Sequence, residues 1–286
     1  MWPNSLPYFT FCLCTTFALT IANKDDTIYP YVGYGAGPTE DIVAFREANT
    51  SPNATGIVDL EVYNLRANLD SVQNVLWQAT LNVTEVTNLN YTDAATDVIT
   101  NSVIGINALE NWVENSTWTT TIFILEISSR NVIVSGQRDT GNCYATLGET
   151  CVQEYLNNAD LTNISAQYPT SPSIPTNCDD KIAGSYGGGF NGSDADGSGY
   201  FFSASWVHNA SNTTFYENAV TKIWPLLVIQ RNEAHGIQTA SLSCLKANAT
   251  MVGSKAIGGV PSVATGFQIY GWVVMAVASA VGLMFL

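Results

Sequence analysis

The sequence predicts a mainly β, disulfide-pinned domain, arranged as an antiparallel sandwich or jelly roll with two or three short helices. An α+β arrangement stays open. Two observations favour the β class: several segments alternate apolar and polar residues, and others are rich in β-branched and aromatic residues. A third observation, four cysteines in the central region, indicates disulfides. With 46% hydrophobic residues in 286, the chain can build a sizeable core.

The clearest strand is predicted over residues 74–84. There, alternate residues from Val75 to Val83 are apolar, and most residues between them are polar, as in a strand with one buried face. Residues 119–127 form a nearly continuous β-branched and apolar run, typical of a central strand. Further strands are predicted at 57–62, 131–135, 200–207, 226–230 and 237–245, with the last two forming a closing pair.

Helices are predicted in three places. Apolar residues recur at spacings of three and four between Val98 and Val113, which favours one amphipathic helix. Thr150 can cap a short helix that runs through Asn158. A third helix is predicted over 215–224, ended by Pro225.

Both ends of the chain are predicted to be targeting segments. Residues 1–22 have the apolar stretch and small terminal residue of a secretory signal peptide, although a retained hydrophobic anchor is the alternative. Residues 255–286 end in a 20-residue run without charge and follow small residues, as in a glycosylphosphatidylinositol (GPI) propeptide. Ser254 is the preferred attachment site, with Gly253 and Asn248 as alternatives. A retained membrane tail stays open.

The mature domain is therefore predicted to span residues 23–254 as a single glycosylated unit. Its four cysteines predict two disulfides of undetermined connectivity, formed by Cys143, Cys151, Cys178 and Cys244. Asn-x-Ser/Thr sequons, each an expected N-glycosylation site, occur at Asn49, Asn53, Asn82, Asn90, Asn115, Asn163, Asn191, Asn209, Asn212 and Asn248.

The charge of the chain excludes some classes of partner. With 24 acidic and 10 basic residues, the net charge is −14. Nucleic acids and anionic membrane surfaces attract basic patches, so neither is expected as an electrostatic partner. The expected partners are instead a membrane reached through the lipid anchor and cell-wall polysaccharide.

Catalytic and metal sites are weakly indicated. Glu126 lies between apolar neighbours in a predicted strand, and His235 lies in a predicted turn; both are weak catalytic candidates, and the ordinary structural role is favoured for each. Residues 194–198 resemble the start of a calcium loop, but Ser205 replaces the glutamate that completes it. No metal and no cofactor is therefore expected.

Three segments together resemble a class of filamentous-fungal secreted glycoproteins of unassigned activity. They are residues 117–125, Asn142-Cys143 and residues 147–152. The resemblance implies a secretion signal, many sequons and a GPI-type tail, and it carries no catalytic residue.

Together these features predict a GPI-anchored, N-glycosylated protein of the cell surface or cell wall with a structural or interaction role. One alternative is a cofactor-independent enzyme of the secretory pathway that acts on a polysaccharide or a small apolar metabolite. A second alternative is a carbohydrate-binding adhesin.

Overall fold

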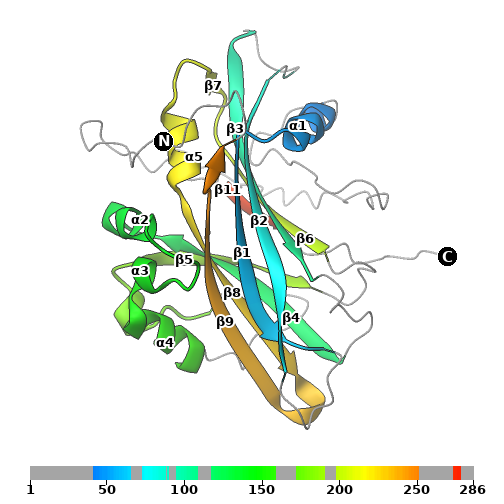
Figure 1. Cartoon of the computed structure of the whole chain (residues 1–286), viewed down its shortest axis with the longest axis vertical. Coiled ribbons are helices and arrows are strands. Elements are labelled where there is room, and N and C mark those ends of the chain that lie inside the picture. Colours follow the sequence, from blue (N-terminus) through cyan, green and yellow to red (C-terminus); the bar gives the residue numbers. More distant parts are fainter. Residues whose placement is uncertain are drawn as a thin grey trace, which may run out of the picture.

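The protein folds into two packed antiparallel sheets, as the computed structural model shows (Figure 1). Helices cover the outer faces of both sheets, and one helix, Thr214–Thr221, packs into the core between them. The structure describes residues 41–65, 73–87, 89, 95–108, 117–158, 172–190, 198–250 and 273–277. The mainly β, sandwich-like architecture predicted from the sequence is confirmed. The described residues hold five α-helices, more than the two or three predicted.

The larger sheet has the strand order β10-β1-β2-β3-β6-β11, with β7 paired to β3. Its strands β1, β2 and β3 form a meander of antiparallel neighbours. Their bounds are β1 Ala54–Tyr63, β2 Asn74–Val86, β3 Asp97–Asn107, β6 Ser198–Ala204, β7 His208–Asn209, β10 Ala249–Thr250 and β11 Val273–Val277.

The smaller sheet has the order β5-β4-β8-β9, and its closing pair β8–β9 is the one predicted from the sequence. Its bounds are β4 Trp118–Ile127, β5 Ile182–Phe190, β8 Ile223–Asn232 and β9 Ile237–Lys246. The helices are α1 Asp41–Thr50, α2 Arg130–Gly136, α3 Tyr144–Leu147, α4 Glu149–Asn158 and α5 Thr214–Thr221, with short 3-10 turns at Thr176–Cys178 and Glu233–His235.

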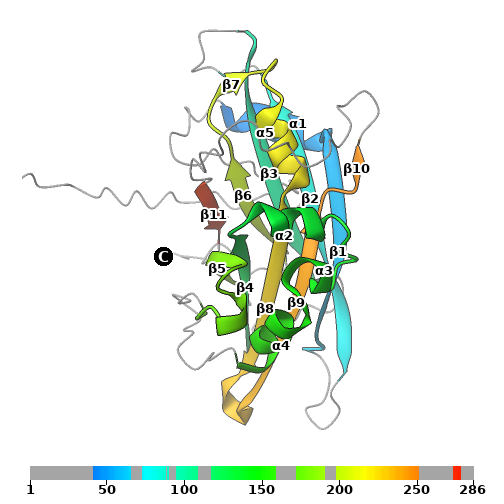
Figure 2. The same ribbon diagram turned by 90° about the vertical axis from the view of Figure 1, so that its left-hand side faces the viewer.

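The main core lies between the two sheets. The predicted inward set of β2, including Trp77 and Leu81, packs there with Ile122 of β4 and Trp224 of β8. The alternation of β4 divides its residues between two cores, because Phe123 and Leu125 face the other side. On that side, α2, α3 and α4 cover the smaller sheet (Figure 2). A third, smaller core forms where Phe45 of α1 packs on the outer face of the larger sheet.

The two sheets also meet edge to edge along β1 and β9. A Cβ on Gly56 would lie 1.9 Å from the carbonyl oxygen of Lys246, so only glycine permits this approach. Ser243 Oγ donates a hydrogen bond to the Asp59 carbonyl oxygen at 3.1 Å, and the Asn248 N–H donates to that of Thr55 at 2.8 Å. This contact between β1 and β9, here called the seam, joins the edge of the larger sheet to the edge of the smaller one.

Two predicted elements are wrong, and a third, the helix over 215–224, is present with an earlier end. The helix predicted from residue 98 is strand β3, which is buried on both faces: Ile104 packs in the main core and Ile99 packs against α1. A strand covered on both sides lacks alternation, and its apolar spacing then imitates a helix. Residues 109–113 lie outside the described part.

The strand predicted at 131–135 is helix α2, because Val132 packs into the core beneath the helices. The helix predicted to end at Pro225 ends at Thr221, and Trp224 and Pro225 belong to β8. Pro225 lies opposite Cys244 in the pairing of β8 with β9.

Candidate functional site: a groove at the seam

A groove of about 870 Å³ lies along the seam between β1, β9 and the loop that leads into α3. Its size falls within the range of small-molecule binding sites. Its lining includes residues of four segments: Ile57, Asp59 and Glu61 of β1, Asn74 and Leu76 of β2, Asn142 and Tyr144 at α3, and Ser241 of β9.

One wall of the groove is a loop that a buried carboxylate organises. Asp139 is 5% exposed. Its Oδ1 accepts hydrogen bonds from the N–H groups of Gly141 at 2.8 Å and Cys143 at 3.0 Å. Its Oδ2 accepts from Thr146, from the N–H at 2.9 Å and from Oγ1 at 2.8 Å. Four donors on one carboxylate fix the backbone that carries Asn142 and Tyr144.

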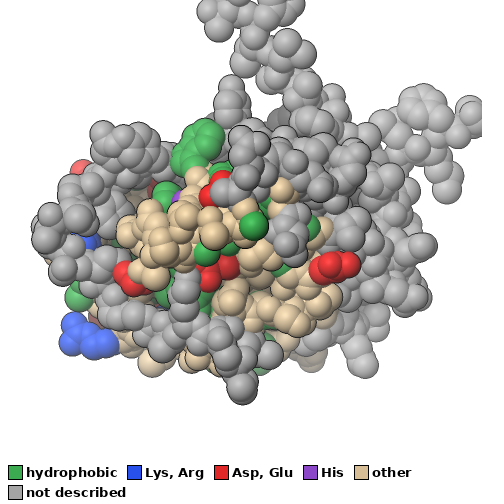
Figure 3. All heavy atoms as spheres, turned by 90° about the horizontal axis from the view of Figure 1, so that it is seen from above, with side chains coloured by type: hydrophobic (Ala, Val, Ile, Leu, Met, Phe, Trp, Pro, Cys, Tyr) green, Lys and Arg blue, Asp and Glu red, His purple; other side chains and the backbone are tan. Residues whose placement is uncertain are grey.

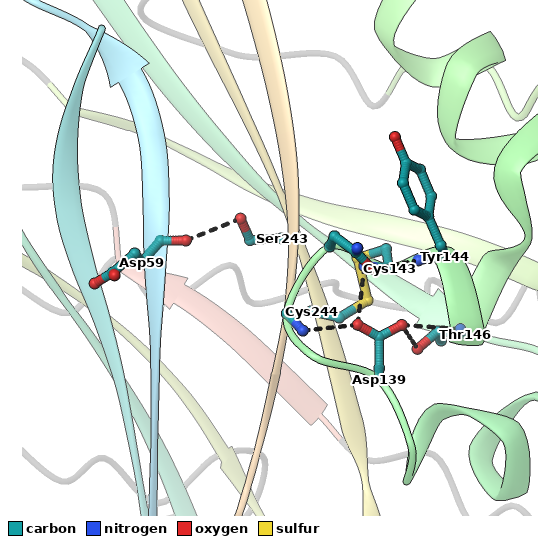
Figure 4. The surroundings of a disulfide bond; sticks show 9 residues. Asp59, Asp139, Cys143, Tyr144, Thr146, Ser243 and Cys244 are labelled. Atoms are coloured by element: carbon teal, nitrogen blue, oxygen red, sulfur yellow. Dashed lines mark hydrogen bonds between the residues drawn. A yellow bond between two sulfur atoms is a disulfide. The ribbon is translucent and has the colours of Figure 1, made fainter.

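The same loop is joined covalently to β9. Cys143 is bonded to Cys244 (Figure 4). The Cys244 N–H donates to the Gly141 carbonyl oxygen at 2.8 Å. Cys143 adopts a left-handed φ of 63°, and Gly141 has φ 112°. Both are sparsely populated backbone conformations for most residues, and the disulfide and Asp139 hold them in place.

The floor of the groove includes two buried residues, Tyr63 of β1 and Gln230 of β8. Gln230 of β8 uses its side-chain amide like a strand backbone: Oε1 accepts from the Tyr63 N–H at 2.6 Å, and Nε2 donates to the Tyr63 carbonyl oxygen at 3.5 Å. Tyr63 in turn stacks on Trp118, with the ring centroids 4.7 Å apart. These contacts tie the end of β1 to the smaller sheet and make the floor rigid.

The rim of the groove combines apolar surface with acceptors and donors. Ile57 and Leu76 are each 52% exposed, and the Tyr144 ring is 43% exposed. Leu76 lies directly opposite Glu61 in the pairing of β1 with β2. Glu61 Oε1 accepts a hydrogen bond from Asn74 Nδ2 at 2.7 Å. Apolar side chains at such exposure beside oriented polar groups are typical of a recognition surface.

The predicted catalytic candidate Glu126 lies elsewhere, at the end of β4, where it is half-buried. A basic neighbour of this carboxylate is Lys222, which immediately precedes β8. Burial lowers the pKa of Lys222 to about 8, although the carboxylate of Glu126 acts in the opposite direction. The Lys222 ammonium lies 3.8 Å from the centroid of the Trp224 ring.

The second catalytic candidate, His235, is exposed at the end of the turn between β8 and β9. The turn predicted there is present, and it lies away from Glu126, so the structure does not bring the two candidates together. Among the described residues, no group of three or more His, Cys, Asp or Glu is arranged to hold a metal ion. Residues 191–197, the centre of the calcium-like loop, lie outside the described residues.

The predicted disulfides are present, and the structure supplies their connectivity: Cys143–Cys244 and Cys151–Cys178. The sequons differ widely in exposure. Asn212 and Asn248 are exposed, whereas Asn49 is only 3% exposed and its Oδ1 accepts from Thr84 Oγ1 at 3.2 Å. Asn53 and Asn82 are half-buried, and Asn209 is exposed. Asn90, Asn115, Asn163 and Asn191 lie outside the described residues.

Of the predicted anchor region, Ser254 and Gly253 lie outside the described residues, and Asn248 follows β9. Within the apolar tail, Val273–Val277 forms β11, which pairs antiparallel with β6. Across the described residues, no helix is sufficiently long and apolar to cross a membrane.

The surface of the molecule seen from above carries several acidic side chains among uncharged polar atoms (Figure 3). Lys and Arg side chains show mainly towards one side of this view.

No protein-family model, curated protein or solved structure matches the chain.

The groove was not predicted from the sequence, because its residues come from segments up to about 180 positions apart, as the Ser243–Asp59 contact illustrates. One signal was present: Asp139, Gly141 and Cys143 lie close together, and such a cluster is typical of an ordered turn rather than a connecting loop.

Proposed function

We propose that this chain is a GPI-anchored, N-glycosylated protein of the cell surface or cell wall that acts by binding a partner in the seam groove. The observation that carries the proposal is the wall of the groove, which Asp139 and the Cys143–Cys244 disulfide hold in a strained conformation. A fixed recess loses little conformational entropy on binding, so it is suited to recognition.

The two disulfides support a surface location, because such bonds form and persist in oxidising compartments. The exposed sequons Asn212 and Asn248 support it as well, since their side chains are accessible to a glycan. The small residues at 253–256 and the apolar tail support anchoring by a lipid.

The location is tested on cells that express the full chain. We expect phosphatidylinositol-specific phospholipase C to release the protein into the medium, and a Ser254→Pro, Gly253→Pro double variant to abolish that release. A matched Ser173→Pro variant, at an exposed residue outside the helices and strands, controls for general effects of proline on export. Retention of the unaltered protein on the cells after the enzyme treatment would contradict the anchor.

One observation favours a second candidate function, the cofactor-independent enzyme. Lys222 and Glu126 are half-buried neighbours at one end of the main core, and an amine with a lowered pKa is suited to proton transfer. If the protein hydrolyses laminarin or chitin, we expect Glu126→Gln to abolish hydrolysis and Val134→Ala, at an exposed residue of α2 outside the groove, to leave it unchanged. Absence of hydrolysis by the unaltered protein would exclude this function for those substrates.

A further inference from the structure

The groove at the seam has a composition that restricts the chemistry of its ligand. Its lining holds carboxylates, amides and hydroxyls, and among the described residues that line it there is no Lys, Arg or His. Anionic ligands require cationic side chains or clustered N–H donors, so the groove does not suit phosphates, sulfates or acidic peptides. What it offers is an array of hydrogen-bond acceptors and donors for a polar, uncharged ligand.

The apolar part of the rim adds a second requirement. The exposed ring of Tyr144 stands beside Asn142, whose Oδ1 accepts from the Tyr144 N–H at 3.1 Å and so fixes the start of α3. Across the groove, Leu76 and Ile57 present aliphatic surface next to Glu61 and Asp59. A ligand that contacts the apolar rim and also hydrogen-bonds to the polar groups of the lining must have flat C–H faces and hydroxyl-bearing edges.

We infer that the groove binds a neutral oligosaccharide. A pyranose ring has an apolar C–H face, which fits the Tyr144 ring, and equatorial hydroxyls, which fit Glu61 and Asn74. The Asn74–Glu61 hydrogen bond holds the carboxylate with one oxygen directed at its partner, so the other can accept from a sugar hydroxyl. This inference names the ligand class for the binding role proposed above and rests on that role.

The test is calorimetric titration of the purified glycoprotein, its N-glycans trimmed by an endoglycosidase, with three probes. The probes are laminarihexaose, chitohexaose and the fully deacetylated, cationic hexamer of chitosan. We expect at least one neutral hexamer to bind. Removal of the ring in Tyr144→Ala should weaken it by about tenfold, which corresponds to about 1.4 kcal/mol.

Matched variants separate loss of the site from loss of the fold. Tyr144→Phe keeps the ring and should bind within about twofold of the parent, since stacking depends on the aromatic face. Glu61→Ala should weaken binding, whereas Val134→Ala, an exposed residue of α2 outside the groove, should not. All four variants should keep the melting temperature of the parent.

Three results would overturn the inference. The protein could bind neither neutral hexamer, or Tyr144→Ala and Tyr144→Phe could bind equally well. The third result is that only the cationic hexamer binds and that its affinity falls with added salt. The last would show that the carboxylates act as simple charges. Because the titration is done in solution, its outcome is independent of the phospholipase experiment, and failure of one proposal is distinguishable from failure of the other.

Discussion

The two faces of the smaller sheet are held to their neighbours by different means. The face towards the helices packs against residues such as Leu147 and Val152 and contains all four bonded cysteines. The face towards the larger sheet holds Trp224 and Trp118 and has no disulfide. It also buries the polar atoms Tyr63 Oη, Thr120 Oγ1, Trp224 Nε1 and Asn232 Oδ1, for which the described residues offer no hydrogen-bond partner.

The difference shows how an outer layer of short helices stays attached. Helices α2 and α3 have seven and four residues, too short to be stable alone, and the core beneath them is small. Covalent bonds and the satisfied carboxylate Asp139 compensate for the limited burial. The inter-sheet core has large aromatic residues to bury, and this burial offsets the cost of several unpaired polar atoms.

The largest effect is expected from removing the disulfide that joins the helix layer to β9. The Cys143→Ala, Cys244→Ala variant should lose about 5 kcal/mol of unfolding free energy, because the bond closes a segment of 101 residues. The Cys151→Ala, Cys178→Ala variant, whose cysteines have a sequence separation of 27, should lose about 3.5 kcal/mol. Denaturant unfolding measures both, and a larger loss in the second variant would contradict this order.

A smaller effect is expected at Asp139. Asp139→Ala leaves the N–H groups of Gly141, Cys143 and Thr146 without their acceptor, which should cost about 3 kcal/mol. The control Thr146→Val removes only the hydroxyl donor and should cost about 1 kcal/mol. Unfolding experiments on both variants give the comparison, and equal losses would mean that the carboxylate does not organise the loop.

The inter-sheet side is tested through Lys222. Its folded-state pKa of about 8 lies below the ordinary 10.5, so between these values the unfolded chain binds more protons and stability rises with pH. Lys222→Met keeps the stem over Trp224 and removes the charge. We expect the variant to be more stable than the parent at about pH 7, with the difference shrinking towards pH 10.

Tyr155 and Tyr216, whose pKa values burial raises to about 12, affect the parent and Lys222→Met equally. The tyrosines therefore cancel in the comparison. Denaturant unfolding at several pH values measures the difference in unfolding free energy between Lys222→Met and the parent. A difference that stays constant from about pH 7 to 10 would show that Lys222 is not desolvated.

The smallest effect on stability is expected at the glycosylation sites. Peptide mapping by mass spectrometry should find Asn49 unmodified, because its side chain is buried and bonded to Thr84. Asn212 and Asn248 should be modified, and Asn212→Gln should leave the unfolding free energy unchanged within about 0.5 kcal/mol. A glycan on Asn49 would contradict the packing of α1 on the larger sheet.

Strands with one solvent-exposed face were predicted correctly from the sequence, whereas a strand buried on both faces was not. Strand β2 alternates cleanly, so its inward set from Trp77 to Val83 was assigned correctly. Strand β3 has apolar residues on both faces, and its spacing was interpreted as helical although Val98, Ile99 and Val103 are β-branched. Helix α2 is the reverse case: three β-branched residues favoured a strand, and tertiary packing decided otherwise.

The candidate site could be predicted only in part. The cysteines were identified, but their connectivity depends on which strands lie side by side. Glu126 was singled out as a carboxylate in apolar surroundings, and its neighbour Lys222, nearly a hundred residues later, is brought to it by the pairing of β4 with β8. The groove depends on the meeting of β1 with β9, which no local pattern encodes.

Strand β11 has a consequence for the tail cleavage that we propose. While the tail is attached, Val273–Val277 occupies the outer edge of β6 and satisfies its backbone groups. Cleavage at Ser254 would remove β11 and leave β6 with a partner on one side only, β3. If the tail is removed as we propose, the backbone groups on that side of β6 become available for pairing with a strand of a neighbouring molecule.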